Sequence, residues 1–256
     1  GKYAGKCVSS GCCNIFLGAD AGGDGVTTGN DNVAVGPSAG RELTSGTGNV
    51  FLGRMAGYQA TSCTNNVFIG LQAGRCSDGS SNIFLGRYAG RGSSTVSSNT
   101  GAENIMLGSS AGYSLTTGGE NIFLGHTAGY GNSTGCCNIA IGYEAGKCAT
   151  DQRDNIAMGM RAAKCATGSY NISMGFCGGY KATEDHNVFI GYYAARNAQA
   201  GCCNIAMGYG SGSSINGGDN NIFLGNAAGS NLSTGACNTF IGVYAGGAGT
   251  VTGNCN

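Results

Sequence analysis

The sequence contains no tryptophan, a single proline and only two histidines among its 256 residues. It has no uninterrupted apolar run near the ~20 residues that a membrane-spanning helix needs, so we expect no membrane insertion. Lysine and arginine together number 13 and balance 13 aspartates and glutamates, which removes the general electrostatic argument for nucleic acid or an anionic membrane as partner. The sequence also lacks a G-x-S-x-G motif, a P-loop and any clustered histidines, and we therefore expect a protein that is not an enzyme.

Glycine, in contrast, accounts for 51 residues. These glycines do not follow the G-X-Y triplet of collagen, and the evenly spaced apolar residues argue against a disordered linker. They recur instead within a short repeat, seen clearly as NIFLGHTAG from Asn121, NIFLGADAG from Asn14 and NIFLGRYAG from Asn82. A fixed short period is the signature of a repeat architecture.

The repeat has a constant internal pattern when its asparagine is counted as position 0. Positions +1 and +3 are apolar except at Thr239, position +4 is always glycine, and positions +7 and +8 are mostly alanine and glycine. This pattern predicts a strand at +1 to +3, a bend at +4, a second and smaller strand at +5 to +8, and a polar connection. Successive repeats are 16 to 18 residues apart, with one step of 22. About 15 such coils, ~4.8 Å apart, predict an all-β fold, a parallel β-solenoid or β-roll.

The asparagines themselves form the first predicted set of functional positions. Stacked coils place equivalent side chains above one another, so each amide can bond to the amide of the next coil. Asparagine also tolerates the left-handed backbone conformation of tight turns. We predict a structural ladder of Asn14, Asn32, Asn49, Asn66, Asn82, Asn104, Asn121, Asn138, Asn155, Asn171, Asn187, Asn204, Asn221 and Asn238.

Position +2 lies on the opposite face of the strand from +1 and +3. We expect +1 and +3 to fill the coil, which leaves a row of phenylalanines on the outside, where it needs a partner. This predicts a homo-oligomer, with a trimer as its natural closure, whose interface contains Phe16, Phe51, Phe68, Phe84, Phe123, Phe189, Phe223 and Phe240. The alternative is that position +2 fills the interior and something else covers +1 and +3. Either arrangement leaves one apolar face for a partner.

The repeat resembles two related families. NVAVG from Asn32 and NIAIG from Asn138 are similar to the head repeat of trimeric autotransporter adhesins, and residues 121–135 resemble the N-x-F-x-G-x-x-A-G repeat of phage tail-fibre proteins. The resemblance covers the whole chain and implies a trimeric, left-handed β-roll on an outward-projecting fibre with an adhesive role. The longer period and the many cysteines depart from the adhesin pattern.

The repeat extends through residues 1–256, which we interpret as one continuous array. Because the sequence begins and ends within a repeat, we expect it to be a segment of a longer fibre. The single long step contains an insertion at 92–101, GSSTVSSNTG. We predict that this insertion forms a protruding loop.

Fourteen cysteines lie almost entirely in the connections. Equivalent positions one coil apart fall within the usual Cα separation of a disulfide. Both a disulfide-stapled extracellular fibre and an assembly with free thiols fit this pattern, and sequence does not reveal connectivity. The candidates are Cys148 with Cys165, Cys237 with Cys255, and Cys7 with Cys12 or Cys13. Vicinal cysteines lack the C-x₂-C spacing of structural zinc sites, so we predict no metal and no cofactor.

Position +9 carries a row of basic and tyrosine side chains, and position +5 adds further aromatic and basic residues such as Tyr192 and Tyr209. The +9 row is either a ligand ridge that grips cell-surface glycans or a set of amphipathic side chains that cover the glycine-rich turns. Its members are Arg41, Tyr58, Arg75, Arg91, Tyr113, Tyr130, Lys147, Lys164, Tyr180 and Arg196.

Together these patterns favour a structural or adhesive segment of a fibre, located on a cell surface, in the extracellular space or on a virion tail. An ice-binding or other surface-binding solenoid is one alternative, although the threonines lie in irregular connections. A second alternative is the non-catalytic shaft of a tailspike-like, glycan-processing protein. A hydrolase on this fold would need paired carboxylates, and the sequence offers no persuasive pair.

Overall fold

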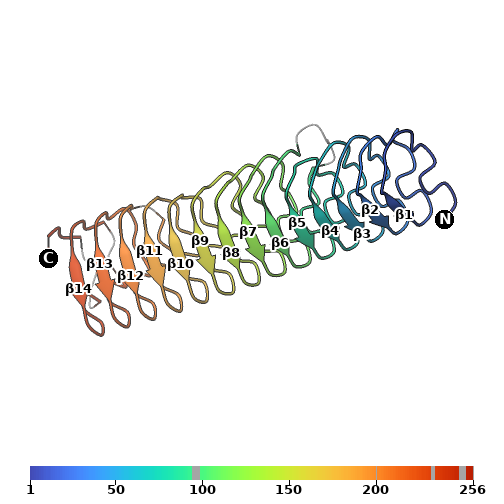
Figure 1. Cartoon of the computed structure of the whole chain (residues 1–256). Helices are drawn as coiled ribbons and strands as arrows, with labels where there is room; N and C mark the ends of the chain where they lie inside the picture. The colour runs from blue at the N-terminus through green and yellow to red at the C-terminus, as the bar shows by residue number, and fades with distance from the viewer. Residues whose placement is uncertain (94–98, 200, 232–233, 248–251, 256) are drawn as a thin grey trace. The chain divides into compact units, whose positions relative to one another are not determined.

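The computed structural model describes residues 1–93, 99–199, 201–231, 234–247 and 252–255. The chain is an all-β parallel β-solenoid of about 13 turns with a repeat of about 17 residues. It divides into two compact units, 1–136 and 137–256. Each unit is a stack of coils, and each coil contributes one short strand to a sheet that runs along the unit (Figure 1).

Every strand is three residues long and occupies positions +1 to +3, as the apolar pattern predicts. The first unit contains β1 (Ile15–Leu17), β2 (Val33–Val35), β3 (Val50–Leu52), β4 (Val67–Ile69), β5 (Ile83–Leu85), β6 (Ile105–Leu107) and β7 (Ile122–Leu124). The second contains β8 (Ile139–Ile141), β9 (Ile156–Met158), β10 (Ile172–Met174), β11 (Val188–Ile190), β12 (Ile205–Met207), β13 (Ile222–Leu224) and β14 (Thr239–Ile241).

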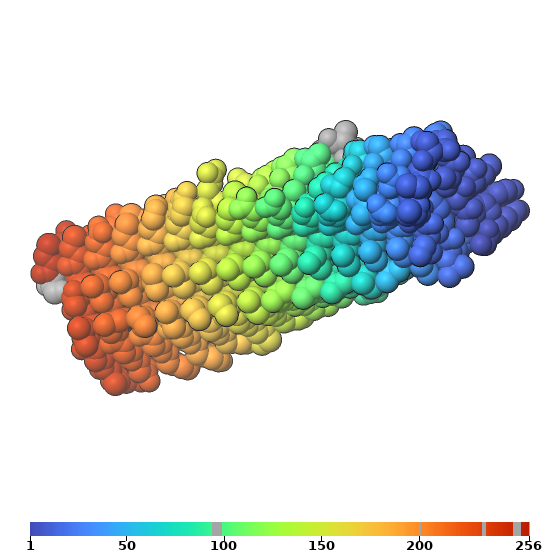
Figure 2. All heavy atoms as spheres, in the orientation of Figure 1, coloured from blue at the N-terminus to red at the C-terminus, as the bar shows by residue number. Residues whose placement is uncertain are grey.

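Within each unit the strands pair in sequence order and in parallel. The register aligns identical repeat positions, so Phe51 lies opposite Phe68 and Phe68 opposite Phe84. Side chains of successive coils consequently form rows, which are visible on the surface of each unit (Figure 2).

The second strand predicted at +5 to +8 is wrong, because these residues form a turn. Position +6 adopts the left-handed conformation even where the residue is not glycine, as at Tyr88 (φ 62°) and Thr127 (φ 55°). A left-handed residue reverses the local backbone direction and cannot continue a strand. Position −1 is also left-handed, for example at Asp31 (φ 56°). The residue at +8 is left-handed as well, as at Gly57 (φ 56°), so each coil contains one strand and left-handed residues at −1, +6 and +8.

Two glycines of the repeat are required by space as well as by backbone conformation. A Cβ on Gly53, at +4, would lie 2.6 Å from the carbonyl oxygen of Gly70 in the next coil. A Cβ on Gly57, at +8, would lie 2.7 Å from the ring of Phe51. Position +4 thus permits close stacking of the coils, and position +8 makes room for the aromatic ring inside them.

The phenylalanines lie in the interior, so the prediction that they form an interface between copies is wrong. Six rings are almost completely buried within a single chain: Phe51, Phe68, Phe84, Phe123, Phe189 and Phe223. Phe16 and Phe240, in the first and last strands, are half-buried. Consecutive rings stack, with centroids 4.8 Å apart for Phe68 and Phe84. The alternative assignment, with +2 inside and +1 and +3 outside, is the correct one.

The interior also shows size compensation between positions +2 and +11. Phe51 shares its coil with the small Ala60, whereas Ala34 shares its coil with the large Leu43, and all four are completely buried. Because interiors are close-packed, a large residue at one position favours a small one at the other, although Met106 and Leu115 are both large and buried in one coil. The same exchange distinguishes the coil of Phe189 and Ala198 from that of Ala206 and Ile215. The coils of Ala140 and Ala157 carry alanine at both positions.

The predicted asparagine positions form hydrogen-bonded ladders within each unit. The Oδ1 atom of Asn49 accepts the backbone N–H of Asn66 at 3.1 Å and its Nδ2 at 3.0 Å. The Nδ2 of Asn66 also donates to the carbonyl of Gly79 at 3.0 Å. Asn49 and Asn66 are completely buried, and the ladder satisfies polar groups that would otherwise be costly inside the protein.

The insertion at 92–101 leaves the stack uninterrupted. Its central residues 94–98 lie outside the described residues, so the predicted loop is not described there. At its base, Ser93 donates its backbone N–H to the Oδ1 of Asn99 at 3.1 Å, and the Nδ2 of Asn99 donates to the carbonyl of Ser93 at 2.8 Å. These two bonds close the base of the insertion.

Candidate interaction surfaces

The first candidate surface is the outer side of the strands, made by positions +1 and +3 and called here the sheet face. Its residues are isoleucine, valine, leucine or methionine except for Thr239. Most are half-buried, because side chains of neighbouring coils shield one another, while Ile69 (37%), Ile83 (39%) and Met207 (40%) are more exposed. The face carries no charged residue. A continuous aliphatic surface of this kind is typical of a site that is covered by a partner.

A second surface is an aromatic column at position +5 of the second unit, formed by Phe176, Tyr192 and Tyr209. Ring centroids are 5.0 Å apart for the first pair and 5.2 Å for the second, with nearly parallel planes. Tyr192 (44%) and Tyr209 (58%) are exposed. Because each ring covers the face of the next, the column presents ring edges and hydroxyl groups to solvent.

Members of the predicted ligand ridge at +9 contact one another across neighbouring coils. Arg41 donates to the Tyr58 hydroxyl at 2.8 Å, and the guanidinium of Arg75 lies 5.5 Å from the Tyr58 ring centroid. Arg91 likewise donates to the Tyr113 hydroxyl at 3.0 Å. These contacts are those expected of amphipathic side chains that cover the turns. Glycan binding by the ridge stays a prediction.

The remaining members of the ridge follow the same pattern of stacking and ion pairing. Tyr113 and Tyr130 stack at 4.9 Å, and the ammonium of Lys164 lies 6.0 Å from the Tyr180 ring. Arg196 instead lies over Tyr193, at 4.5 Å.

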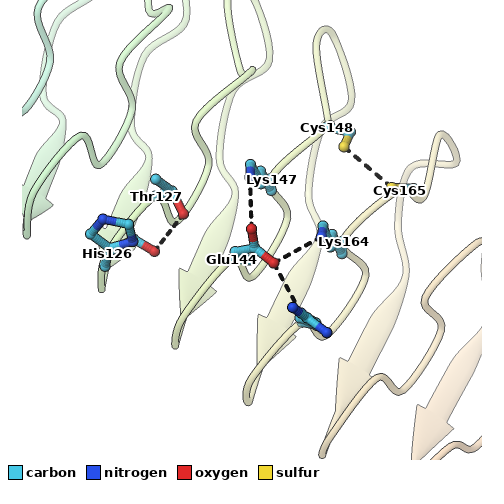
Figure 3. Close-up of polar contacts among 8 residues, drawn as sticks. His126, Thr127, Glu144, Lys147, Cys148, Lys164 and Cys165 are labelled. Carbon is cyan, nitrogen blue, oxygen red and sulfur yellow. Dashed lines mark hydrogen bonds and ion pairs between the residues drawn. The ribbon is translucent and has the colours of Figure 1, made fainter.

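A buried acidic residue, Glu144, is surrounded by three basic side chains. It is only 8% exposed and contacts Lys147 at 2.7 Å, Lys164 at 2.8 Å and Arg161 at 2.9 Å (Figure 3). Hydrogen bonds from Lys147 and Lys164 lower the pKa of Glu144 to about 2. The carboxylate thus ties together the coil that contains it and the following coil.

The sequence analysis included Lys147 and Lys164 in the ridge but did not identify Glu144, the carboxylate that binds both lysines. The signal becomes visible when the repeats are aligned, because Glu144 and Arg161 occupy position +6 of consecutive coils and the lysines occupy +9. Charges at these spacings meet only if the intervening +6 to +9 segment is a turn, which the predicted second strand obscured.

The cysteines are all free thiols. Of the pairs nominated from sequence, Cys148 and Cys165 have their sulfur atoms 3.2 Å apart. The thiol of Cys12 is directed instead at the Oδ1 of Asn30, at 3.3 Å. Burial raises the pKa of the Cys63 thiol to about 12, which disfavours the nucleophilic thiolate at neutral pH.

Two kinds of site were searched for among the described residues. They contain no group of three or more histidine, cysteine, aspartate or glutamate side chains arranged to hold a metal ion. No helix in the same ranges combines the length and apolar character of a membrane span. Comparison with protein-family models, with curated proteins and with solved structures found no match to this chain.

Proposed function

We propose that this chain is a structural segment of a fibre on a cell surface or virion, and that it assembles with further copies of itself through the sheet face. The sheet face is the observation that carries the proposal. It is aliphatic along every strand of each unit, with Thr239 as the exception, and it remains accessible in the single chain. The stacked ladder and aromatic interior suit a rigid structural role more than a mobile catalytic scaffold.

A second copy of the chain is the occupant that matches this surface best. Both copies present side-chain rows with the same ~4.8 Å coil spacing, so the rows of one copy can fit between those of the other. A face without charge offers little to an acidic or basic partner. A left-handed trimer, with the three sheet faces around a common axis, is the arrangement implied by the resemblance to adhesin heads and tail fibres.

An adhesive role through glycans is favoured by the exposed aromatic column. Its hydroxyl groups and ring edges can donate and accept hydrogen bonds from sugar hydroxyls. An ice-binding role is less well supported, because Thr44 and Thr116 already donate their hydroxyls to carbonyls of the next coil, at 2.9 and 3.0 Å. Glycan-array binding with Tyr192→Ala and Tyr209→Ala variants tests the adhesive role.

The assembly is tested by placing charge on the sheet face. We expect the native chain to sediment as an oligomer and the Ile69→Glu/Ile83→Glu variant to sediment as a folded monomer, because both side chains are partly exposed in one chain. The matched control is Ser45→Glu/Thr117→Glu, which adds the same charge at two exposed positions in the connections.

Analytical ultracentrifugation and circular dichroism together give the result. Loss of the oligomer in the sheet-face variant alone, with an unchanged spectrum, supports the proposal. A native chain that stays monomeric at high concentration, or a control variant that dissociates equally, contradicts it.

A further inference from the structure

Cys148 and Cys165 occupy the same repeat position, +10, on consecutive coils of the second unit. Their sulfur atoms are 3.2 Å apart (Figure 3). The backbones of the two coils are hydrogen-bonded beside them, since the N–H of Cys148 donates to the carbonyl of Lys164 at 2.8 Å. Adjacent hydrogen-bonded coils keep equivalent Cα atoms ~4.8 Å apart, within the range that a disulfide spans.

The two sulfur atoms are held near one another by the residues that precede them. Lys147 and Lys164 both form ion pairs with the buried carboxylate of Glu144, at 2.7 and 2.8 Å. The same two coils are therefore clamped together directly next to the thiols. A pair that is already positioned in the reduced protein loses little conformational freedom when the bond forms.

We propose that Cys148 and Cys165 are a redox-controlled modification site, at which a disulfide staples neighbouring coils of the second unit. A small-molecule disulfide such as oxidised glutathione is the oxidant. The thiolate of one cysteine attacks it and forms a mixed disulfide, with release of one glutathione thiolate. The second cysteine thiolate then attacks the protein sulfur of that mixed disulfide and displaces the other glutathione. Two protein thiols lose two protons and two electrons, and the oxidant becomes two thiols.

Cys76 and the pair Cys202 and Cys203 resemble this setting but do not offer the cross-coil bond. Cys76, also at +10, is completely buried and donates to the Oε1 of Gln59 at 3.1 Å. Cys202 and Cys203 have sulfur atoms 3.3 Å apart, but they are adjacent residues, and their bond would close a small ring without linking two coils. They provide an internal control.

The surroundings of the two thiols also determine the pH at which the disulfide forms readily. Burial and the hydrogen bond with Cys165 raise the pKa of Cys148 to about 11, so little thiolate is present at neutral pH and exchange is slow. Alkaline pH accelerates the bond. Once formed, it ties two coils 17 residues apart, and separation of these coils then requires breaking a covalent bond. In a stack where each coil contacts only its neighbours, this opposes local opening.

The experiment uses the full chain at pH 8.5 with oxidised glutathione, followed by iodoacetamide and tryptic digestion without reduction. Cleavage after Lys147 and Lys164 releases peptides 148–153 and 165–181. We expect these two peptides to be recovered as one cross-linked species, with fragmentation assigning the bond to Cys165 and not to Cys177 of the same peptide. The Cys148→Ser variant should lose the species while Cys202 and Cys203 react as before.

Amide hydrogen exchange supplies a readout that does not depend on a variant. In the oxidised native chain we expect amides of the two linked coils to exchange at least about tenfold more slowly than in the reduced chain. The exchange rates of amides in the first unit should be unchanged. Recovery of Cys148 and Cys165 as separate alkylated or glutathionylated peptides overturns the proposal. Equal exchange rates in a chain shown to be cross-linked would overturn its stabilising role.

Discussion

The side-chain amide of Asn104 donates to the Oδ1 of Asn82 at 3.1 Å although the two residues are 22 positions apart in the chain. Elsewhere in the ladder the same bond joins residues 17 or 18 positions apart, as from Asn66 to Asn49 and from Asn32 to Asn14. The ladder therefore keeps its geometry across the longest coil. Ser93 and Asn99, on either side of the residues that lie outside the described ranges, form two hydrogen bonds with each other.

Deletion of residues 94–98 should consequently leave a folded chain. The deletion removes five residues from a step of 22 and returns it to the common repeat length. Circular dichroism should be unchanged and the melting temperature should shift by no more than about 3 °C, because surface insertions affect stability weakly. Deletion of residues 44–48 is the control, since it removes the carbonyl of Gly46 that accepts from Asn32. A similar loss of stability in both deletions would contradict the prediction.

Substitution of a ladder asparagine should be severe. Asn221→Ala removes the acceptor of the Asn238 backbone N–H (2.9 Å) and the donor to the Gly235 carbonyl (3.0 Å). Each buried group left without a partner costs ~1–3 kcal/mol, so we expect a total loss of about 3 kcal/mol or more. Asn226→Ala, at an exposed position of the same coil, should change stability by less than about 0.5 kcal/mol. Urea unfolding measures both, and comparable losses would argue against the ladder.

Glu144 should make the second unit sensitive to acid. Its pKa is lowered from 4.5 to about 2 by its lysine and arginine partners. A lowered folded-state pKa means that the stabilisation is fully present above pH 4.5 and is lost as the pH falls from 4.5 towards 2. Glu144→Gln should be less stable than the native chain at pH 6, and the difference should shrink as the pH falls through this window.

Thermal melts between pH 2 and 7 check the acid response. The exposed Glu184→Gln variant controls for the loss of one negative charge. A constant difference between the native chain and Glu144→Gln across the whole range would show that the carboxylate does not act through its ionised form.

The size compensation between positions +2 and +11 predicts that a second substitution restores stability lost through a first. Ala206 and Ile215 both lie near the space above Gly212, where a Cβ would be 3.2 Å from the Cβ of Ala206 and 2.9 Å from the Cδ1 of Ile215. Ala206→Phe should overpack this space and cost about 1–3 kcal/mol. Ile215→Ala alone should leave a cavity. The double variant recreates the Phe189 and Ala198 combination of the preceding coil and should recover much of the loss. An additive double-mutant cycle would exclude the coupling.

Much of the fold was predictable because the repeat is local. The alternation of +1, +2 and +3 places a strand, glycine at +4 ends it, and the constant spacing predicts parallel stacking with asparagines in line. The Cys148–Cys165 proximity followed from the same alignment. The Glu144 cluster did not, because it depends on how the +5 to +9 segment bends.

By itself, the sequence determined the period, the position of each strand and the alignment of equivalent residues, since these depend only on residue type and spacing along the chain. Only the tertiary structure decided which apolar side faces inward. Strand alternation places Phe51 on one face of the strand and Val50 and Leu52 on the other. It does not show which of the two faces points into the coil. The chain bends at left-handed residues at −1, +6 and +8, and at +6 they include residues such as Tyr88 and Thr127 that carry no signal for that conformation. Those bends fold the chain over the phenylalanines and leave the aliphatic rows outside.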